Sequence, residues 1–211
     1  CRLAAHSPQN ITRFEMADSP GNPIFLDLPT AIDTARLHLR PPQPGDGLAL
    51  HAAIVESMPD LRRFLASLPW VAAEQSIESA ELFCRNGHAN FLLRKDLPFL
   101  VFGKGSGQLI GSMGLHRTDW SVPRTEVGYW VRSSRSGHGF VQEAVKALVG
   151  YAFAHLRVVR IELITDEANA RSRKVAERCQ FRLEGVMLNE RRAPDGSLRN
   201  TCVYARVAPS A

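Results

Sequence analysis

The segment Arg135-Ser136-Gly137-His138-Gly139-Phe140 has the residue types of a loop that binds a phosphate group. It connects an alternating run, 125–132, to the longest amphipathic run of the chain, so a strand should lead through it into a helix. The first N–H groups of a helix have no internal partner, the helix dipole adds partial positive charge there, and glycines let a ligand approach closely. Arg132 and Arg135 bring formal positive charge to the same place. Two glycines alone are a weak signal, and a tight connection without a ligand explains them about as well.

Other side chains have functional groups suited to acid–base or binding chemistry. Glu126 lies on the strand before the loop, where a carboxylate can accept a proton, although a salt-bridged or solvated carboxylate is the alternative. Asn169 and Ser172 stand at the start of a short helix, where both can simply act as caps. Trp70 can form the wall of an acceptor pocket, although a half-buried core tryptophan is the commoner case. The 7 histidines show no metal-binding spacing, so no metal is expected, and His116 is assigned to the end of a strand.

These residues need a scaffold, and periodicity predicts one mixed sheet with helices packed on it. Apolar residues recur at three and four positions from Phe140 to Leu156, which predicts a long helix that must lie on a sheet. The strands that flank this helix can be parallel, whereas the glycine turn 103–107 predicts an antiparallel hairpin. Pro59 should divide an earlier helical run in two. Strands are expected at 37–40, 97–102, 108–115, 125–132, 159–163, 181–187 and 201–207, and further helices at 48–68, from 76, and at 170–179.

Length and composition favour a single soluble domain. The 211 residues, 45% of them hydrophobic and 22% charged, suffice for one core, which we place at 29–211, after a loosely ordered N-terminal arm at 1–28. The apolar runs are shorter than the roughly 20 residues that cross a bilayer. The 4 scattered cysteines indicate reduced thiols in a cytoplasmic protein. The net charge of +5 is spread along the chain and a phosphorylated ligand explains it, so neither a membrane nor a nucleic acid is an expected partner.

Several motifs occur in a defined order along the chain. Glu126-Val127-Gly128-Tyr129-Trp130-Val131 precedes the glycine loop and its helix, and Asn169-Ala170-Arg171-Ser172 and Phe181 follow them. This order resembles the GCN5-related N-acetyltransferase (GNAT) superfamily, and within it the ribosomal-protein N-acetyltransferase branch, which is RimJ/RimL-like. The resemblance extends over roughly Thr34 to Val207. The combination is specific, although its parts are not.

The resemblance implies an α/β fold with a single GNAT-like domain. Its central sheet would be mixed and mostly antiparallel, with six to seven strands, about four flanking helices and a splayed acetyl-CoA cleft. In the family, the strand backbone before the loop pairs with pantetheine as if with another strand, and the loop amides hold the pyrophosphate. The residues implied to bind acetyl-CoA, the cosubstrate, are Trp130, Val131, Arg132, Arg135, Ser136, Gly137, His138, Gly139, Phe140, Val141, Asn169 and Ser172.

The chain departs from the family pattern at positions that concern catalysis and packing. Ala176 replaces the tyrosine that protonates the leaving thiolate in many members, and the RimL-like branch instead has a serine, here Ser172, suggested as the acid. Gln180 stands where a glycine usually precedes the phenylalanine, so distortion of the helix end is expected. The attacking amine must lose a proton, and the candidate bases are Glu126 and Glu190, the latter because the branch places a glutamate before the last strand.

The function implied is transfer of acetyl from acetyl-CoA to a primary amine. The family suggests the α-amino group of a protein N-terminus as the acceptor, and a small amine such as a polyamine, an antibiotic or an amino acid fits nearly as well. An acyl-CoA-binding module without catalysis is a different class of function, motivated by the missing tyrosine. An RNA-associated protein is disfavoured because no aromatic and basic stacking platform is visible. Homodimerisation through the final strands is a further expectation.

Overall fold

The computed structural model describes residues 22–208 and contains one mixed sheet with helices on both faces. Its strand order is β1-β2-β3-β4-β5-β6-β8-β7, and every neighbouring pair is antiparallel except β5 with β6. The strands are β1 (Ile32–Asp33), β2 (Leu37–Arg40), β3 (Leu97–Gly103), β4 (Leu109–Asp119), β5 (Arg124–Val131), β6 (Arg160–Asp166), β7 (Arg182–Arg192) and β8 (Leu198–Val207). The α-helices are α1 (Gly47–Leu65), α2 (Pro69–Ala72), α3 (Ile77–Leu92), α4 (Phe140–Tyr151) and α5 (Ala170–Arg178).

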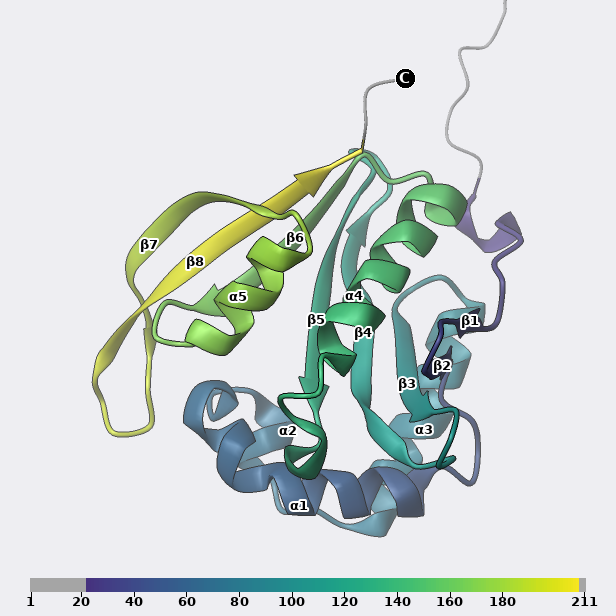
Figure 1. Cartoon of the computed structure of the whole chain (residues 1–211), viewed down its shortest axis with the longest axis horizontal. Coiled ribbons are helices and arrows are strands. Elements are labelled where there is room, and N and C mark those ends of the chain that lie inside the picture. Colours follow the sequence, from purple (N-terminus) through teal and green to yellow (C-terminus); the bar gives the residue numbers. More distant parts are fainter. Residues whose placement is uncertain (1–21, 209–211) are drawn as a thin grey trace, which may run out of the picture.

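The two parallel strands separate after a short paired stretch. The pairing of β5 with β6 runs only from Arg124↔Arg160 to Glu126↔Glu162. Beyond it the strands diverge, as Figure 1 shows, and β6 continues its pairing with β8 instead. Part of the backbone of β5 therefore lies beside an opening in the sheet. The predicted parallel pair and splayed sheet are confirmed.

Alternation along the central strands divides their side chains between the two faces of the sheet. Met113, Leu115 and Val127 point into the larger core cluster, which also contains the buried face of α4. Leu100 and Trp130 belong to the second cluster, with residues of α1 and α3. Figure 1 shows α4 and α5 on the near face of the sheet. Each residue of β4 and β5 can thus be assigned to the α4/α5 face or to the α1/α3 face.

Three details of the fold differ from expectation. The sheet has eight strands within residues 22–208 because the two-residue strand β1 joins its edge, and the short helix α2 raises the number of α-helices to five. The helix α1 is continuous through Pro59, so the predicted division is wrong. Pro59 lies on the exposed face, where water can satisfy the freed carbonyl, while the buried face holds the helix together with Leu50, Ile54 and Leu61.

The segment before β1 contacts the domain where the structure describes it. Leu28 is buried in the larger core, and the Leu26 carbonyl accepts a hydrogen bond of 2.7 Å from Arg94. The rest of the expected arm, 1–21, lies outside the described residues, so the boundary at residue 28 stays a prediction. Within 22–208, no helix is both long and apolar enough to span a membrane.

Gln180 leaves the end of α5 regular. It takes the left-handed conformation with φ of 66°, and its N–H bonds to the Glu177 carbonyl at 3.0 Å. The Phe181 N–H then bonds to the Ala176 carbonyl at 2.9 Å, which closes the helix end as in a glycine-terminated helix. The expected distortion is therefore wrong, and the non-glycine residue instead carries backbone strain.

Gly47 allows α1 and α3 to approach closely. A methyl group at Gly47 would lie 2.7 Å from the backbone N of Glu81, so Gly47→Ala should lower the free energy of unfolding by about 1–3 kcal/mol. Gly150→Ala is the matched control, because a methyl group there meets nothing within 4 Å, and it should stabilise the fold by about 0.5–1 kcal/mol. Urea unfolding measures both changes, and equal effects of the two substitutions would contradict this account of the contact.

Gln180→Gly should stabilise the protein. Glycine removes the steric cost of the left-handed conformation, and its greater freedom in the unfolded chain offsets part of the gain, which leaves about 0.5–1 kcal/mol. Gln180→Ala is the control, since alanine keeps the strain and should give no gain. Thermal unfolding of the three proteins in parallel checks the order, and a loss of stability in Gln180→Gly would show that the glutamine side chain matters more than its backbone.

Candidate active site

A cavity of about 1230 Å³ passes through the opening between β5 and β6. Residues from both faces of the sheet line it. On one side lie the loop before α4 and the first turns of α4 and α5. On the other side lie α1, α2 and their connection, together with β4. The opening in the sheet therefore joins two compartments, one on each face.

The glycine loop has the geometry that the sequence predicts. Gly137 and Gly139 have φ of 82° and 79°, in the left-handed region that favours glycine. Gly139 is the N-cap of α4, and Ser136, Gly137, Gly139, Phe140 and Val141 line the cavity. The helix N-terminus is thus directed at the compartment on the α4/α5 face, where it favours an anion. The ring of His138 stacks on that of Phe140 with centroids 5.9 Å apart, and His138 is not among the lining residues.

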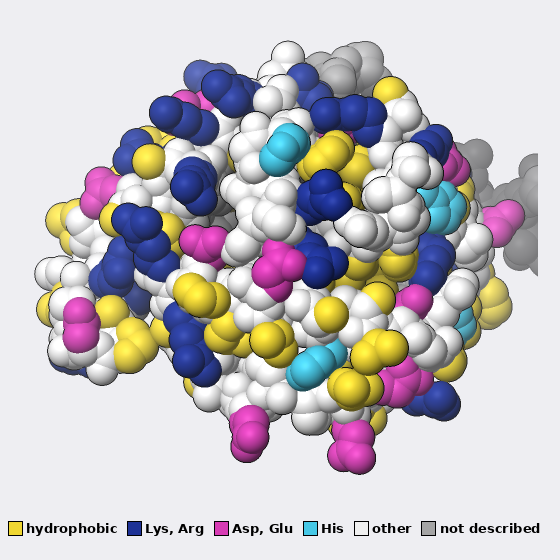
Figure 2. Space-filling view, turned by 60° about the horizontal axis from the view of Figure 1, so that its bottom comes forward, with side chains coloured by type: hydrophobic (Ala, Val, Ile, Leu, Met, Phe, Trp, Pro, Cys, Tyr) yellow, Lys and Arg dark blue, Asp and Glu magenta, His cyan; other side chains and the backbone are white. Residues whose placement is uncertain are grey.

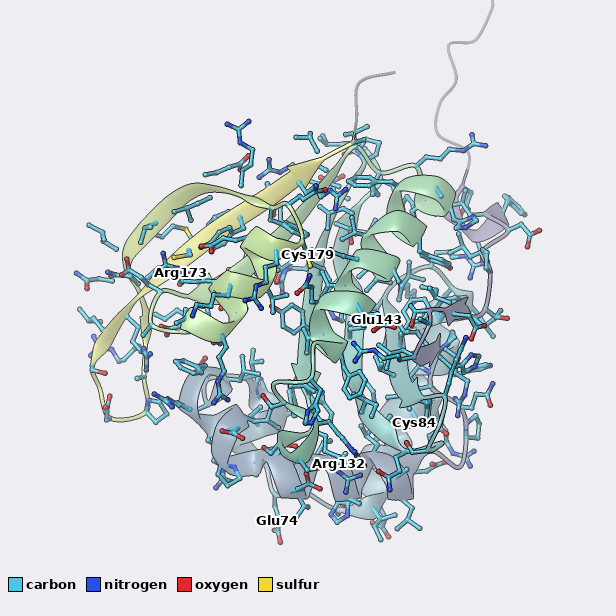
Figure 3. The ribbon with its side chains drawn as sticks, in the orientation of Figure 1. Glu74, Cys84, Arg132, Glu143, Arg173 and Cys179 are labelled. Carbon is cyan, nitrogen blue, oxygen red and sulfur yellow. The ribbon has the colours of Figure 1, made fainter. Side chains whose placement is uncertain are left out.

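Arg36, the residue before β2, holds this loop in place. Its Nη1 donates to the His138 carbonyl at 3.1 Å, and its guanidinium lies 4.6 Å from the centroid of the Phe140 ring. Glu143 of α4, labelled in Figure 3, accepts hydrogen bonds from Arg36 and from the Thr34 hydroxyl at 2.6 Å. Burial opposes ionisation of Glu143, but these hydrogen bonds outweigh it and lower the pKa of the carboxyl. Sequence reasoning gave Arg36 no role, because its partners are about 100 residues away.

The two predicted loop arginines lie in different environments. Arg132, seen near α1 in Figure 3, pairs through Nε with Glu56 at 2.6 Å, and it does not line the cavity. Hydrogen bonds from Ser134, followed by Arg132, lower the pKa of Glu56 to about 2, so this carboxylate ties the loop to α1. Arg135 lines the cavity, and its guanidinium bonds to Gln108. The role of either residue in binding acetyl-CoA stays a prediction.

A row of cations on α5 was missed by sequence reasoning. Arg171, Lys174 and Arg178 all line the cavity, and their spacing of three and four places them on one face of the helix. Their positive charge faces the same compartment as the glycine loop. The spacing was visible in the sequence, but only the packing of α5 beside the opening shows which face it exposes. Phosphate groups are the ligand chemistry that these side chains and the loop share.

Tyr129 and Ser172 meet on the α4/α5 face. The Tyr129 hydroxyl lies 2.9 Å from the Ser172 hydroxyl, and both residues line the cavity. Burial raises the pKa of Tyr129 to about 12, so the phenol keeps its proton at neutral pH. Asn169 accepts a hydrogen bond from the Ser172 N–H at 3.1 Å, which confirms Asn169 as the helix cap. The Ser172 side chain is left to pair with the tyrosine, a contact that the sequence did not suggest.

The α1/α3 face contributes the other compartment. Trp70 is 38% exposed and lines the cavity, with its ring centroid 6.4 Å from that of Trp130. Trp70 is thus an exposed residue of the cavity wall and belongs to neither core cluster. Glu126 also lines this part and forms an ion pair with Arg117. The aromatic rings and the carboxylate suit an amine that arrives as an ammonium ion.

Glu190 lies outside the cavity lining and on a strand rather than in a connection. It is exposed on β7, where it accepts a hydrogen bond of 2.7 Å from the Thr201 hydroxyl. This bond and the neighbouring Arg191 lower the pKa of its carboxyl. The geometry therefore favours Glu126 over Glu190 as a group near the reaction, and the role of each as base stays a prediction. Among residues 22–208, no group of three or more His, Cys, Asp or Glu side chains could hold a metal ion.

The splayed sheet, the glycine loop and the cations of α5 together form a site suited to an extended ligand that bears phosphate groups. The model of the acetyltransferase (GNAT) domain family matches residues 36–182, so the chain belongs to the GNAT family. It is an acetyl-CoA-dependent N-acetyltransferase that transfers acetyl to an amine.

Relatives of this family have known names and structures. The ribosomal-protein-serine acetyltransferase of Escherichia coli is 25% identical over 176 residues, which cover 78% of this chain and 95% of that protein. A structure of a ribosomal L7/L12 α-N-protein acetyltransferase with coenzyme A has a TM-score of 0.77 at 21% identity and covers 84% of this chain and 97% of that one. An immunity acetyltransferase for microcin C7, solved with acetyl-CoA and AMP, has a TM-score of 0.75 at 21% identity, over 83% and 94% of the two chains.

Gly139→Ala should weaken binding of coenzyme A. A methyl group at Gly139 meets only the Arg36 guanidinium, at 3.5 Å, so the penalty comes from the left-handed backbone and amounts to about 1–2 kcal/mol, or roughly 5- to 30-fold in affinity. Gly105→Ala is the control, because Gly105 lies in the β3–β4 turn outside the cavity lining, has no neighbour within 4 Å and should leave binding normal. Calorimetric titration with coenzyme A measures both. Equal affinities would show that the loop backbone does not hold the ligand.

Proposed function

We propose that the acceptor is the α-amino group of a polypeptide N-terminus. The observation that supports this most directly is the compartment on the α1/α3 face, which is a wide extension of the cavity beyond the sheet opening. Asp60 and Glu74 bring negative charge to it, Glu126 is paired with Arg117, and Phe64 and Trp70 bring aromatic faces that favour an ammonium group. The named relatives that act on ribosomal proteins support the same class of acceptor.

The surface around this compartment is open to a large acceptor. Figure 2 turns the region of α1 and α2 toward the viewer, and Lys, Arg, Asp, Glu and apolar side chains are interspersed on it. Arg191, near the end of the β7–β8 hairpin, lines the same cavity as Trp70 of α2. A polypeptide end can therefore be held between the hairpin and α2 while its amine enters the sheet opening. A small amine would use only the inner part of this space.

The cosubstrate and the amine reach the reaction from opposite faces of the sheet. The loop and the cations of α5 bind the phosphates on the α4/α5 face, and Ser172 donates a proton to the departing thiolate. Tyr129 positions Ser172 through the hydrogen bond of 2.9 Å and stays protonated itself. The amine enters from the α1/α3 face, where its proton is removed. Holding both reactants at one opening lowers the entropic part of the barrier.

We also propose that the protein works in the cytoplasm and that it forms a homodimer. Cys84, Cys179 and Cys202 are buried and free, and burial raises the pKa of Cys84 to about 12, which suits a reducing cytoplasm.

The edge strand β7 exposes Leu183 and Leu188, the latter 73% exposed. Covering this edge with a second copy would form a homodimer through the final strands.

Thiol release should accompany addition of peptides with a free N-terminus to enzyme and acetyl-CoA. Ser172→Ala and Tyr129→Phe should each lower kcat, by about 100-fold or more for the serine, because general acid catalysis contributes at least about that much. Coenzyme A affinity should change little. Ser121→Ala, in a turn away from the cavity, is the control and should keep full activity.

The acceptor is tested separately by comparing each peptide with its N-acetylated form and with polyamines, an aminoglycoside and free amino acids. Release with free peptides alone supports the proposal. Release with small amines and none with peptides would replace it by a small-molecule acceptor on the same cavity.

A further inference from the structure

His116 places an imidazole in the acceptor compartment. It lies on β4, directly opposite Glu126 of β5, and both line the cavity. Strand alternation puts both on the α1/α3 face, opposite the Tyr129–Ser172 pair. The sequence had assigned His116 to a strand end without a chemical role, but β4 continues to Asp119. A titratable ring thus lies beside the path of the amine.

Asp96 orients this ring. Its carboxylate oxygen lies 2.8 Å from Nδ1 of His116, and among residues 22–208 this is the one hydrogen bond of the ring. A carboxylate only accepts hydrogen bonds, so Nδ1 carries the proton in the neutral ring. The lone pair is then on Nε2. Asp96 stands just before β3, in line with His116 across the sheet.

The ring of His116 packs over a pair of glycines. Gly114 and Gly128 face each other in register on β4 and β5. A methyl group at Gly114 would lie 2.7 Å from Nε2 of His116, and one at Gly128 would lie 3.3 Å from the same atom. The ring therefore occupies a hollow that any other residue pair would fill. Nε2 therefore lies above the facing pair of glycines on β4 and β5.

The nearby carboxylate is already paired. Arg117 has a φ of 51° at a bulge after His116, and its guanidinium binds Glu126, which is 12% exposed. Bulges beside active sites commonly re-aim a side chain in this way. The other charged groups that line this compartment are Asp60, Glu74 and Arg191, with Asp166 on β6. Asp60, Glu126 and Asp166 are each paired, to Ser133, Arg117 and Arg199, and Glu74 is exposed outside the strands, whereas Nε2 of His116 lies on the sheet with no hydrogen bond among residues 22–208.

We propose that Nε2 of His116 takes the proton of the attacking amine, directly or through one water, with Asp96 as the positioning residue. The amine nitrogen bonds to the acetyl carbon, the carbon–sulfur bond breaks, and the proton passes from nitrogen to Nε2. The thiolate receives a proton from Ser172, which regains one from solvent, and Nε2 releases its proton to solvent. This inference rests on amine acetylation but not on the size of the acceptor.

The test is the pH dependence of kcat/KM for acetyl-CoA at saturating acceptor. The wild type should lose rate as pH falls, which gives the profile an acidic limb, because a protonated ring accepts no proton. His116→Gln should lower kcat by about 100-fold at neutral pH and remove this limb. Asp96→Asn should also lower kcat, because the ring loses the carboxylate that keeps the proton of the neutral ring on Nδ1. Coenzyme A affinity should stay within about twofold in both variants.

Two controls separate the inference from its alternatives. His155→Gln, on the exposed side of the segment after α4, should leave the profile unchanged. Glu126→Gln should keep the limb and lose less rate than His116→Gln. A limb that persists in His116→Gln, or one that disappears only in Glu126→Gln, would overturn the proposal. If His116→Gln fails to fold, an unchanged kcat in Asp96→Asn would overturn it.

The same profiles measured with a small amine decide which claim fails. If the wild type acetylates small amines and no peptide, the polypeptide acceptor is wrong while the His116 test still holds. If peptides are acetylated and His116→Gln retains its rate and limb, only the role of the imidazole is wrong.

Discussion

The limited pairing of β5 with β6 is the constraint on which the rest of the structure depends. Only three residue pairs join these strands, so the pairing of the sheet is interrupted between β5 and β6. The opening connects the two faces, and each face then needs its own cover: α4 and α5 on one, α1 and α3 on the other. Because alternate residues of β5 point to opposite faces, Tyr129 and Glu126 serve different compartments although they are three positions apart.

The net charge of +5 does not tell how many cations face the cosubstrate site, because ion pairs engage some of the arginines near it. Arg132 binds Glu56, and Arg36 binds Glu143, so two arginines beside the loop act mainly as supports for its backbone. On the α4/α5 face, the cations that line the cavity are Arg135 and those of α5. The cations around the glycine loop are therefore divided between holding the loop and facing the cavity.

Patterns that are local in sequence predicted most of the fold. The helix α4, the loop glycines, the parallel crossover and the final strands follow from periodicity and backbone preference. The continuity of α1 through Pro59 did not, because it depends on which face of the helix is buried. The candidate site likewise has a part that local sequence patterns predicted and a part that they did not. Gly137, Gly139 and Asn169 were recognisable, whereas Arg36, the Tyr129–Ser172 contact and the Asp96–His116 pair join residues 20 to 102 positions apart and arise only from strand register and packing.

The hollow formed by Gly114 and Gly128 also limits how the sequence can drift. An added methyl group at Gly114 meets the His116 ring and, at 3.1 Å, the Leu97 carbonyl, and one at Gly128 meets only the ring, so a change at either glycine forces the ring to move. The three positions thus form an epistatic unit, in which the order of mutations matters. In a lineage that loses the imidazole, the glycine at position 128, whose close neighbours are atoms of that ring, becomes free to vary first.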